Sequence, residues 1–374
     1  MSIFSIPQGL RLPKQLSFLR QESGILGVDI GSSSIKVVQL KKEKERAMLE
    51  TYGELSLAHY ARGEEGRGSV VLVQDKLRQA LGDVLRESQA KASRAVVSLP
   101  LRNSFVTTMP MPELSQKELK DAVLYEARKY VPIPLAEATI DWWVLPPQPT
   151  DAESTSLGSP KRPFVTVLLV AVPNDVIEQY KKLFSSVNVT IEAFEIESFA
   201  LARATAHAEA GGAVVVVDMG ATSTKVALVD GGVVRAAHSI PQGAWGLTQA
   251  LQQSLGLDFE RAEMLKREFG IVRRPETQGA VSVLEPLVDA SALETERFVL
   301  EWKRKGGRGV SRVVLAGGGA LLRGVDDVFI KKLGVEAIIA NPFSRVIYPA
   351  FLEPSLKDIG SIFSNAVGLA LRGF

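Results

Sequence analysis

Apolar and polar positions follow the same order in two stretches of the chain. Residues 25–40 have the sequence ILGVDIGSSSIKVVQL, and residues 214–229 have the sequence VVVVDMGATSTKVALV. In each stretch an apolar run enters a turn that holds an Asp, a Gly and hydroxyl side chains, and a second apolar run leaves it. Apolar runs joined by small polar residues predict β-hairpins. The repeat therefore predicts two related units in one chain.

The pattern between the two hairpins predicts a helix and then, from near residue 93, a compact α+β insertion. Apolar residues at helical spacing predict a helix over residues 70–89, and an apolar run predicts a strand over residues 93–99. Ser115 and Glu118 match a capping box, so we expect a helix from this point to about Tyr130. Further strands are expected at residues 105–109, 139–145, 164–172 and 189–196, and helices at residues 173–186 and 197–209.

After the second hairpin, helices and short strands follow one another. Strands are expected at residues 233–239, 312–315 and 335–340, and helices at residues 245–255, 259–269, 286–305 and 321–333. Residues 358–371 predict a final helix with one apolar side. Residues 146–163 are rich in Pro, Ser and Thr, which predicts a loop. The chain as a whole is predicted to be an α/β protein.

Composition excludes several classes of protein. Of the 374 residues, 46% are hydrophobic and 23% charged, which is typical of a globular protein, and the net charge of +2 gives no sign of nucleic-acid binding. There is no Cys and there are only three His, so neither a disulfide nor a His-rich metal site is expected. The apolar runs are too short to cross a bilayer, and the start lacks the apolar core of a signal peptide. We expect a cytoplasmic protein.

The first 23 residues combine apolar side chains with basic charge only, up to Glu22. Pro7, Gly9 and Pro13 interrupt any early helix. Two interpretations remain open. The segment is either a partly ordered tail that packs on its own domain or a docking segment for a membrane surface or a partner.

The two predicted turns have the chemistry of a phosphate site. Glycine lets the backbone approach a ligand closely, successive amides form a concave donor site, and hydroxyls add further donors. Asp29 and Asp218 would repel a bare phosphate but could hold Mg²⁺ between themselves and the phosphates. The alternative is a pair of ordinary Asp-x-Gly turns. The predicted nucleotide contacts are Gly31, Ser32, Ser33, Ser34 and Lys36 in the first turn, and Gly220, Ala221, Thr222, Ser223 and Lys225 in the second.

A third motif, SRVVLAGGGALLRG at residues 311–324, predicts a strand that ends in Gly317, Gly318 and Gly319 before a helix. Such a junction exposes backbone amides and lets a base or ribose lie against the backbone, although a plain tight turn is the alternative. Glu263 and Lys266 lie three residues apart on a predicted helix, so they share a face. They either flank the ribose or adenine edge or form a solvated ion pair.

Two such hairpins and a late triple glycine resemble the actin, heat-shock chaperone and sugar-kinase ATPase superfamily. The PilM family of actin-like type IV pilus assembly proteins is the closer resemblance, over nearly all of residues 24–374. Besides the three motifs, it is carried by the sequences EARKYVPIP (126–134), LLVAVPND (168–175), EIESFALAR (195–203), ANPF (340–343) and GLALRGF (368–374).

The resemblance implies an α/β, actin-like two-lobed ATPase fold with duplicated mixed-sheet domains and an inserted α+β subdomain. ATP and Mg²⁺ would lie in the central cleft, and Glu126 would be the catalytic residue that orients the attacking water, its alternative being a carboxylate on a helix surface. The implied division of the chain is a tail (1–23), the first lobe (24–92), the inserted subdomain (93–189), a first-lobe helix (190–211), the second lobe (212–355) and a C-terminal helix returning to the first lobe (356–374).

Three functions fit these expectations. The resemblance implies an ATP-binding scaffold on the cytoplasmic side of the inner membrane, with the N-terminal peptide of a PilN-like membrane protein as partner, possible contacts to pilus assembly ATPases, and membrane contact only through the partner. Related folds occur in type II secretion proteins. A small-metabolite kinase would need a carboxylate base for its acceptor, and we find no candidate. An FtsA-like filament protein would need a C-terminal membrane helix after a linker, which is not found here.

Overall fold

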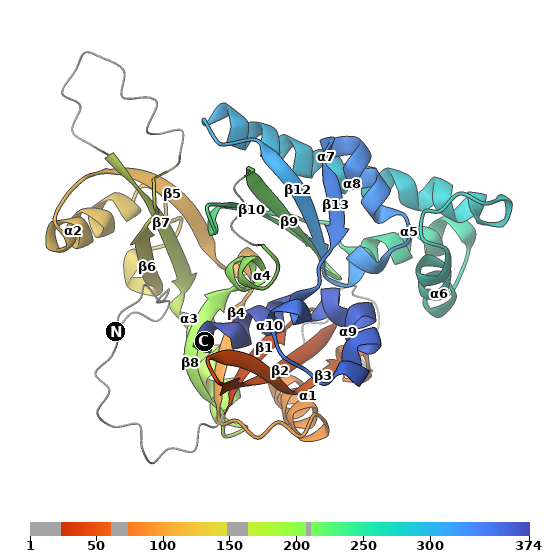
Figure 1. Ribbon diagram of the computed structural model, residues 1–374, viewed down its shortest axis with the longest axis horizontal. Coiled ribbons are helices and arrows are strands. Elements are labelled where there is room, and N and C mark those ends of the chain that lie inside the picture. Colours follow the sequence, from red (N-terminus) through yellow and green to blue (C-terminus); the bar gives the residue numbers. More distant parts are fainter. Residues whose placement is uncertain (1–23, 61–73, 148–163, 207–210) are drawn as a thin grey trace.

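Three β-sheets organise the molecule (Figure 1). The computed structural model describes residues 24–60, 74–147, 164–206 and 211–374. The two five-stranded sheets have the orders β3-β2-β1-β4-β8 and β11-β10-β9-β12-β13. In each, an antiparallel hairpin is extended by a strand that runs parallel to its first member, β4 beside β1 and β12 beside β9. The two sheets thus repeat one topology, as the repeated sequence pattern predicts.

The first lobe is built on the first of these sheets. Its hairpin turns between β2 and β3 at Lys44 and Glu45, which both have positive φ. Helices α1 and α3 cover one face, where Leu81 and Phe184 join the apolar core. The elements of this lobe are β1 (Ile25–Ile30), β2 (Ser34–Glu43), β3 (Arg46–Ser56), η1 (Leu57–His59), α1 (Gln74–Glu87), β4 (Arg94–Leu99), η2 (Leu101–Asn103), α3 (Asn174–Ser185), β8 (Thr190–Ile196) and α4 (Glu197–Thr205).

The second lobe contains the longest helix, α7, which lies across the top of the molecule in Figure 1. It packs on the second sheet through a separate apolar core that includes Leu284 and Val288. The elements of this lobe are β9 (Ala213–Met219), β10 (Thr224–Asp230), β11 (Val233–Ile240), α5 (Ala244–Leu255), α6 (Phe259–Phe269), η5 (Pro275–Thr277), α7 (Gln278–Arg304), β12 (Val310–Ala316), η6 (Gly318–Leu321), α8 (Val325–Leu333) and β13 (Glu336–Ile339).

The inserted subdomain is smaller than expected. Its three-stranded sheet consists of β5 (Phe105–Pro112), β7 (Phe164–Pro173) and β6 (Ala138–Val144), covered by α2 (Gln116–Ala127), with η3 (Leu135–Glu137) before β6. The expected boundaries at residues 93 and 189 differ from this arrangement, because β4 and β8 pair with each other in the first sheet and α3 packs on that lobe. The Ser115–Glu118 capping box is confirmed.

The chain returns to the first lobe earlier than residue 355. Phe343 and Val346 already pack with Val38 and Leu40 of β2. The single helix expected at residues 358–371 is wrong, because the segment is divided into short helices. The returning elements are η7 (Pro342–Arg345), η8 (Ala350–Leu352), α9 (Glu353–Ile359), η9 (Gly360–Phe363), α10 (Ser364–Ala370) and η10 (Leu371–Gly373).

Helix α10 is buried on every side, between β1 and α4. Two glycines permit this close packing. A Cβ on Gly27 would lie 2.0 Å from the carbonyl oxygen of Ala366, and a Cβ on Gly368 would lie 1.8 Å from that of Ala200. Helices α4 and α10 therefore meet backbone to backbone.

The tail at residues 1–23, and most of the loop expected at residues 146–163, lie outside the described residues. Among the helices that the structure does describe, none combines the length and the apolar character needed to span a bilayer.

Candidate functional site

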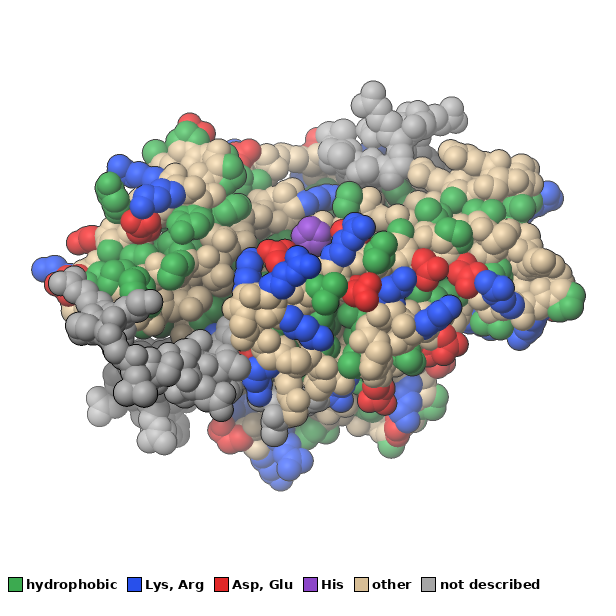
Figure 2. Space-filling model, turned by 90° about the horizontal axis from the view of Figure 1, so that it is seen from above, with side chains coloured by type: hydrophobic (Ala, Val, Ile, Leu, Met, Phe, Trp, Pro, Cys, Tyr) green, Lys and Arg blue, Asp and Glu red, His purple; other side chains and the backbone are tan. Residues whose placement is uncertain are grey.

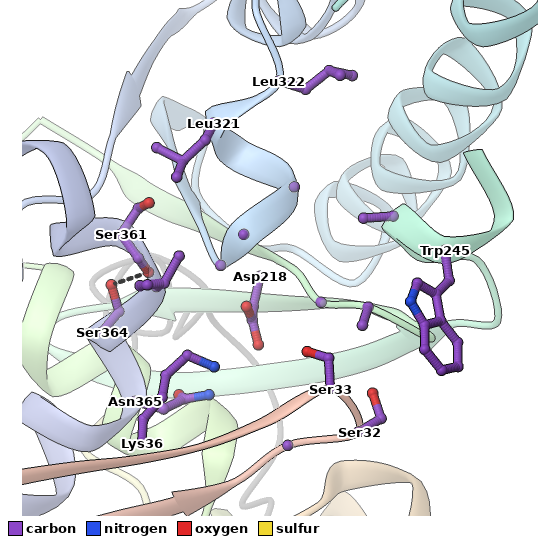
Figure 3. Close-up of a pocket in the computed structure, with 18 of the residues that line it drawn as sticks. Ser32, Ser33, Lys36, Asp218, Trp245, Leu321, Leu322, Ser361, Ser364 and Asn365 are labelled. Atoms are coloured by element: carbon purple, nitrogen blue, oxygen red, sulfur yellow. Dashed lines mark hydrogen bonds between the residues drawn. The ribbon is translucent and has the colours of Figure 1, made fainter. Parts of the chain in front are cut away.

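A cavity of about 440 Å³ lies where the two five-stranded sheets face each other (Figure 3). This volume is within the usual range for small-molecule sites. The two hairpin turns, the triple glycine, helices α5 and α6, and the segment that joins η9 to α10 all contribute to its walls. Residues separated by more than three hundred positions in the sequence thus meet at one site.

The structure brings most of the predicted site residues to this cavity. Four of the predicted residues do not line it: Ser34, which is buried in the first hairpin, Thr222 and Ser223 of the second turn, and Glu126. The predicted residues that line the cavity are Asp29, Gly31, Ser32, Ser33, Lys36, Asp218, Gly220, Ala221, Lys225, Glu263, Lys266, Gly317, Gly318 and Gly319.

The two hairpins have matching internal geometry. Asp29 is opposite Lys36 across the β1–β2 ladder, and Asp218 is opposite Lys225 across the β9–β10 ladder. In each turn a glycine amide donates back to the chain, from Gly31 to the Ser34 carbonyl at 3.0 Å and from Gly220 to the Ser223 carbonyl at 3.1 Å. Tight turns of this kind orient the neighbouring amides toward one point, which favours an anion.

The two turns also touch each other. The Thr222 hydroxyl of the second turn donates to the Ser32 hydroxyl of the first at 3.1 Å. Ser32 lines the cavity and Thr222 does not, so this contact lies at the cavity's edge. Residues of both turns line the cavity beside this contact.

The carboxylates near the two lysines are buried and already have donors. Asp29 Oδ1 accepts from the Ser98 hydroxyl at 2.8 Å, and Lys225 Nζ lies 3.3 Å from both Asp218 Oδ2 and Glu197 Oε2. Burial acts to lower the pKa of Lys225, but the charges of Asp218, Glu197 and Asp29 outweigh it and raise this pKa. The lysine therefore stays positively charged at the floor of the cavity.

Glu197 is a cavity residue that the sequence did not single out. It begins α4, accepts from the backbone amide of Leu101 at 2.9 Å, and is buried. Burial raises the pKa of its carboxyl group, and the charge of Lys225 opposes that rise. An acidic residue in the first turn of a helix is common for reasons of helix dipole alone, so its position in the sequence carries no functional signal.

Lys36 is positioned by partners on two strands. Its Nζ donates to the Ser34 hydroxyl at 2.7 Å, which in turn donates to Glu54 Oε1 at 2.7 Å. Glu54 of β3 also lies 3.5 Å from Lys36 Nζ. Ser34, a predicted ligand contact, is thus a positioning group for Lys36 and not part of the wall.

Glu263 and Lys266 form a partly buried pair on the opposite wall. Lys266 Nζ donates to Glu263 Oε2 at 2.6 Å, to the Thr248 hydroxyl at 2.8 Å and to the Ala244 carbonyl at 3.0 Å. Burial lowers the pKa of Lys266 in spite of Glu263. Burial would raise the pKa of Glu263, but its hydrogen bonds from Lys266 and Thr248 lower it. Lys266 is only 6% exposed, so the pair is not a solvated surface contact.

The triple glycine forms a wall that a side chain would close. Gly317 has a φ of 78°, and a Cβ there would lie 2.4 Å from Asp218 Oδ1; a Cβ on Gly319 would lie 2.7 Å from that of Met219. The Gly317 amide donates to the Ser361 carbonyl at 2.9 Å. Leu321 adds an apolar surface beside the glycines. The backbone here can therefore lie directly against a flat ligand.

Glu126 is not in the site. It lies on α2, the helix of the inserted subdomain at the far left of Figure 1, and it forms an ion pair with Lys129 at 2.8 Å. The helix that joins the two large sheets along the chain is α4, which lies between β8 of the first sheet and β9 of the second. Among the described residues, the carboxylates outside the two turns that line the cavity are Glu54, Glu197 and Glu263, and Glu197 is the one that lies beside Lys225.

Several other wall residues were missed as well, because they lack a local motif. Trp245 begins α5 at the rim, and its ring packs edge-on against Phe259 at 6.4 Å. Ser361 and Asn365 come from the returning segment and also line the cavity. The sequence analysis treated this segment as a packed amphipathic helix, which hid the polar side chains on its cavity side.

The residues present fit a magnesium polyphosphate. Mg²⁺ is usually held by one or two carboxylates together with waters and phosphate oxygens, and Asp29 and Asp218 supply two. Within the described ranges, no group of three or more His, Cys, Asp or Glu side chains is placed so that it could hold a metal ion.

Comparison with known proteins gives one family and one fold. A family profile described as “Type IV pilus assembly protein PilM” matches residues 27–374. The chain is similar to the solved “PilM-PilN type IV pilus biogenesis complex”, with 24% identity, a TM-score of 0.77, and coverage of 93% of this chain and 98% of that chain.

Two further structures have a similar fold. The ethanolamine utilization protein EutJ from Carboxydothermus hydrogenoformans is 17% identical, with a TM-score of 0.54 and coverage of 93% of this chain and 89% of that one. MreB5 of Spiroplasma citri bound to AMPPNP is 11% identical, with a TM-score of 0.53 and coverage of 94% and 96%. At these identities the solved structures establish the fold, which is the two-lobed arrangement described above.

Proposed function

The chain belongs to the PilM family of type IV pilus assembly proteins, and from this premise we propose that it is an ATP-binding scaffold of the pilus assembly machinery. The scaffold holds ATP and Mg²⁺ in its central cavity and binds the N-terminal peptide of a PilN-like inner-membrane protein. The observation that carries the nucleotide part is the pair of matching turns, each with a carboxylate and a lysine, on opposite walls of one cavity.

The wall chemistry supports an orientation for the nucleotide. Backbone amides of the two turns and the Ser32 and Ser33 hydroxyls of the first turn, with Lys36, provide donors for phosphate oxygens. The triple glycine and Leu321 provide a flat apolar wall for the nucleoside, next to the Glu263–Lys266 pair. Asp29 and Asp218 would hold Mg²⁺, which when bound would offset the charge of the phosphates. A ligand in this position contacts both lobes, so it stabilises the closed arrangement.

Glu197 is the residue that we propose for orienting water. It reaches the cavity floor from α4, and its raised pKa suits a group that accepts a proton. The Leu101 amide and Lys225 fix its direction. Hydrolysis itself is not required for the scaffold role, because binding alone can shift the arrangement of the lobes.

The inserted subdomain is the proposed place of partner contact. Figure 2 shows hydrophobic side chains gathered on this subdomain, at the left of the view. Leu124, Tyr125 and Tyr130, on α2 and just after it, are all more than one-third exposed. Exposed aromatic and aliphatic groups of this kind are typical of a surface that binds another chain. The proposed location at the inner face of the cytoplasmic membrane follows from that partner.

The nucleotide part is tested by removing one carboxylate at a time. Calorimetry should show that Asp29→Ala and Asp218→Ala each weaken MgATP binding by about tenfold or more, because a carboxylate hydrogen-bonded to the metal shell is lost. Without nucleotide, both substitutions should lower the melting temperature only slightly. In Asp218→Ala, for example, Glu197 still pairs with Lys225.

Asp230 provides the matched control. It is a buried carboxylate at the end of β10, outside the cavity, and it forms an ion pair with Arg308. Asp230→Ala should lower the melting temperature and leave ATP affinity unchanged. If Asp29→Ala and Asp218→Ala behave like Asp230→Ala, these carboxylates are structural turn residues and the nucleotide proposal is wrong.

The partner is tested with labelled N-terminal peptides of neighbouring PilN-like membrane proteins. Anisotropy measurements should show that one of them binds, and that saturating MgATP changes its affinity. Tyr125→Ser should weaken binding of the peptide and leave ATP binding unchanged. If the peptide affinity is the same with and without MgATP, the proposed dependence of partner binding on the nucleotide is wrong.

A further inference from the structure

The polar side chain of Asn365 makes no hydrogen bond to any described residue. It lies on α10, a helix in which every residue is buried, and it is itself 7% exposed. Its Oδ1 atom is buried without a hydrogen-bond partner, and its amide nitrogen donates to no described residue. Burial of an unpaired carbonyl oxygen is unfavourable, so an asparagine in this position of a native protein needs an explanation.

The carboxamide of Asn365 is directed into the central cavity. Figure 3 shows its amide nitrogen and the ammonium group of Lys36 pointing into the space on the side where Asp218 lies. Leu321 and Leu322 lie at the opposite end of the same view. Asn365 therefore faces the part of the cavity with the charged turns, away from the apolar wall.

The neighbouring carboxylates do not use this donor, although they line the same cavity. Asp29 accepts from Ser98, Asp218 from Lys225, and Glu197 from the Leu101 amide and Lys225. The amide nitrogen of Asn365 thus stays available for a ligand. A neutral N–H donor beside an ammonium group suits an anionic acceptor.

We propose that Asn365 is a phosphate-binding residue that donates from its amide nitrogen to a phosphate oxygen of the nucleotide. This inference rests on the proposed function. It adds a contact from a third part of the chain to those from the two hairpin turns. Because α10 packs against both β1 and α4, the contact also joins the nucleotide to the segment through which the chain returns to the first lobe.

The test compares two substitutions at this position by calorimetry, with ATP and with adenosine as ligands. Asn365→Ala should weaken ATP binding by roughly tenfold, because one hydrogen bond to a charged oxygen is lost, and should change adenosine binding by less than about twofold. Asn365→Asp replaces the donor by a carboxylate, so like-charge repulsion should weaken ATP binding further than Asn365→Ala does.

Asn174→Ala is the control for a merely structural asparagine. Asn174 donates to the Ala136 carbonyl at 3.0 Å and accepts from the Thr139 hydroxyl at 2.8 Å, both outside the cavity. Asn174→Ala should lower the melting temperature without nucleotide and keep ATP affinity. Asn365→Ala should keep the melting temperature without nucleotide, since no internal hydrogen bond is lost.

If the wild-type protein binds ATP, any one of three outcomes would overturn the proposal. They are an unchanged ATP affinity in Asn365→Ala, an equal loss of ATP and adenosine binding, and an Asn365→Asp protein that binds ATP as well as Asn365→Ala or better. A wild-type protein that binds no ATP would overturn the proposed nucleotide function itself, and this inference with it.

Discussion

Gly368 allows helices α4 and α10 to touch. A Cβ at this position would lie 1.8 Å from the carbonyl oxygen and 2.4 Å from the carbonyl carbon of Ala200. Real contacts of this kind are not shorter than 3.0 Å, and the atoms in the way belong to the backbone, which has no rotamer with which to yield. Gly368→Ala therefore forces α10 and α4 apart.

The cost follows from what surrounds the contact. Leu369 and Ala370 are fully buried, so a shift of α10 opens the packing around them. Overpacking that moves backbone typically costs up to about 3 kcal/mol, and this contact is at the severe end. For a chain of this size such a cost lowers the melting temperature by roughly 6 °C or more. Thermal melts followed by circular dichroism measure this directly.

Gly82 is the matched control with the opposite expected sign. It lies inside α1, and the nearest atom to an added Cβ is Val187 Cγ1 at 3.9 Å, an ordinary contact. Alanine in a helix interior is favoured over glycine by about 0.5–1 kcal/mol, so Gly82→Ala should raise the melting temperature slightly. If Gly368→Ala melts within about one degree of the wild type, or above it, the close approach of α10 and α4 is not what the structure indicates.

Three further predictions concern the cavity. MgATP should change the tryptophan fluorescence of the wild type but not of Trp245→Phe, because Trp245 is the tryptophan that lines the cavity among the described residues. Glu197→Gln should slow any ATP hydrolysis by about a hundredfold with ATP affinity retained, and equal hydrolysis rates would exclude the proposed role. Because folding lowers the pKa of Glu263, its carboxylate stabilises the fold at pH values above its ordinary pKa of 4.5. This stability is lost as the pH falls below 4.5 and through the lowered pKa. Melting temperatures of Glu263→Gln should therefore depend less on pH between about 5 and 3, and a dependence equal to that of the wild type would contradict this reasoning.

Sequence patterns correctly predicted the elements whose structure is determined by residues close together in the chain. The hairpin at residues 25–40 and its repeat at residues 214–229 were recognised because alternation and turn residues define them within sixteen positions. Helix α6 was predicted with its observed bounds, since Asp258 caps it and Gly270 ends it. The boundary at residue 93 could not be predicted, because strand partners are chosen by tertiary packing: β4 pairs with β1 and β8, which lie far away in the sequence.

The choice of Glu126 over Glu197 shows where local reasoning stops. Both are acidic residues on helices, and both lie in segments that carry the family resemblance. Only the three-dimensional arrangement separates them, since α4 follows a strand of the first sheet and points its first residue at the cavity floor, whereas α2 covers the inserted sheet. Asn365 was missed for a related reason, because one polar residue in an apolar helix gives no periodic signal.

Helices α4 and α10 give the proposed coupling between the nucleotide cavity and the peptide surface a physical route. Glu197 begins α4 at the cavity floor, and two residues later the ring of Phe199 packs against Trp143 of the inserted sheet, with ring centroids 5.6 Å apart. Since Gly368 holds α10 directly against α4, a nucleotide that contacts Asn365 and the cavity floor acts on both helices at once. Packed elements shift as units because interiors are dense. A change in the spacing of the lobes must therefore either move Phe199 relative to Trp143 of the inserted sheet or carry that sheet along with α4.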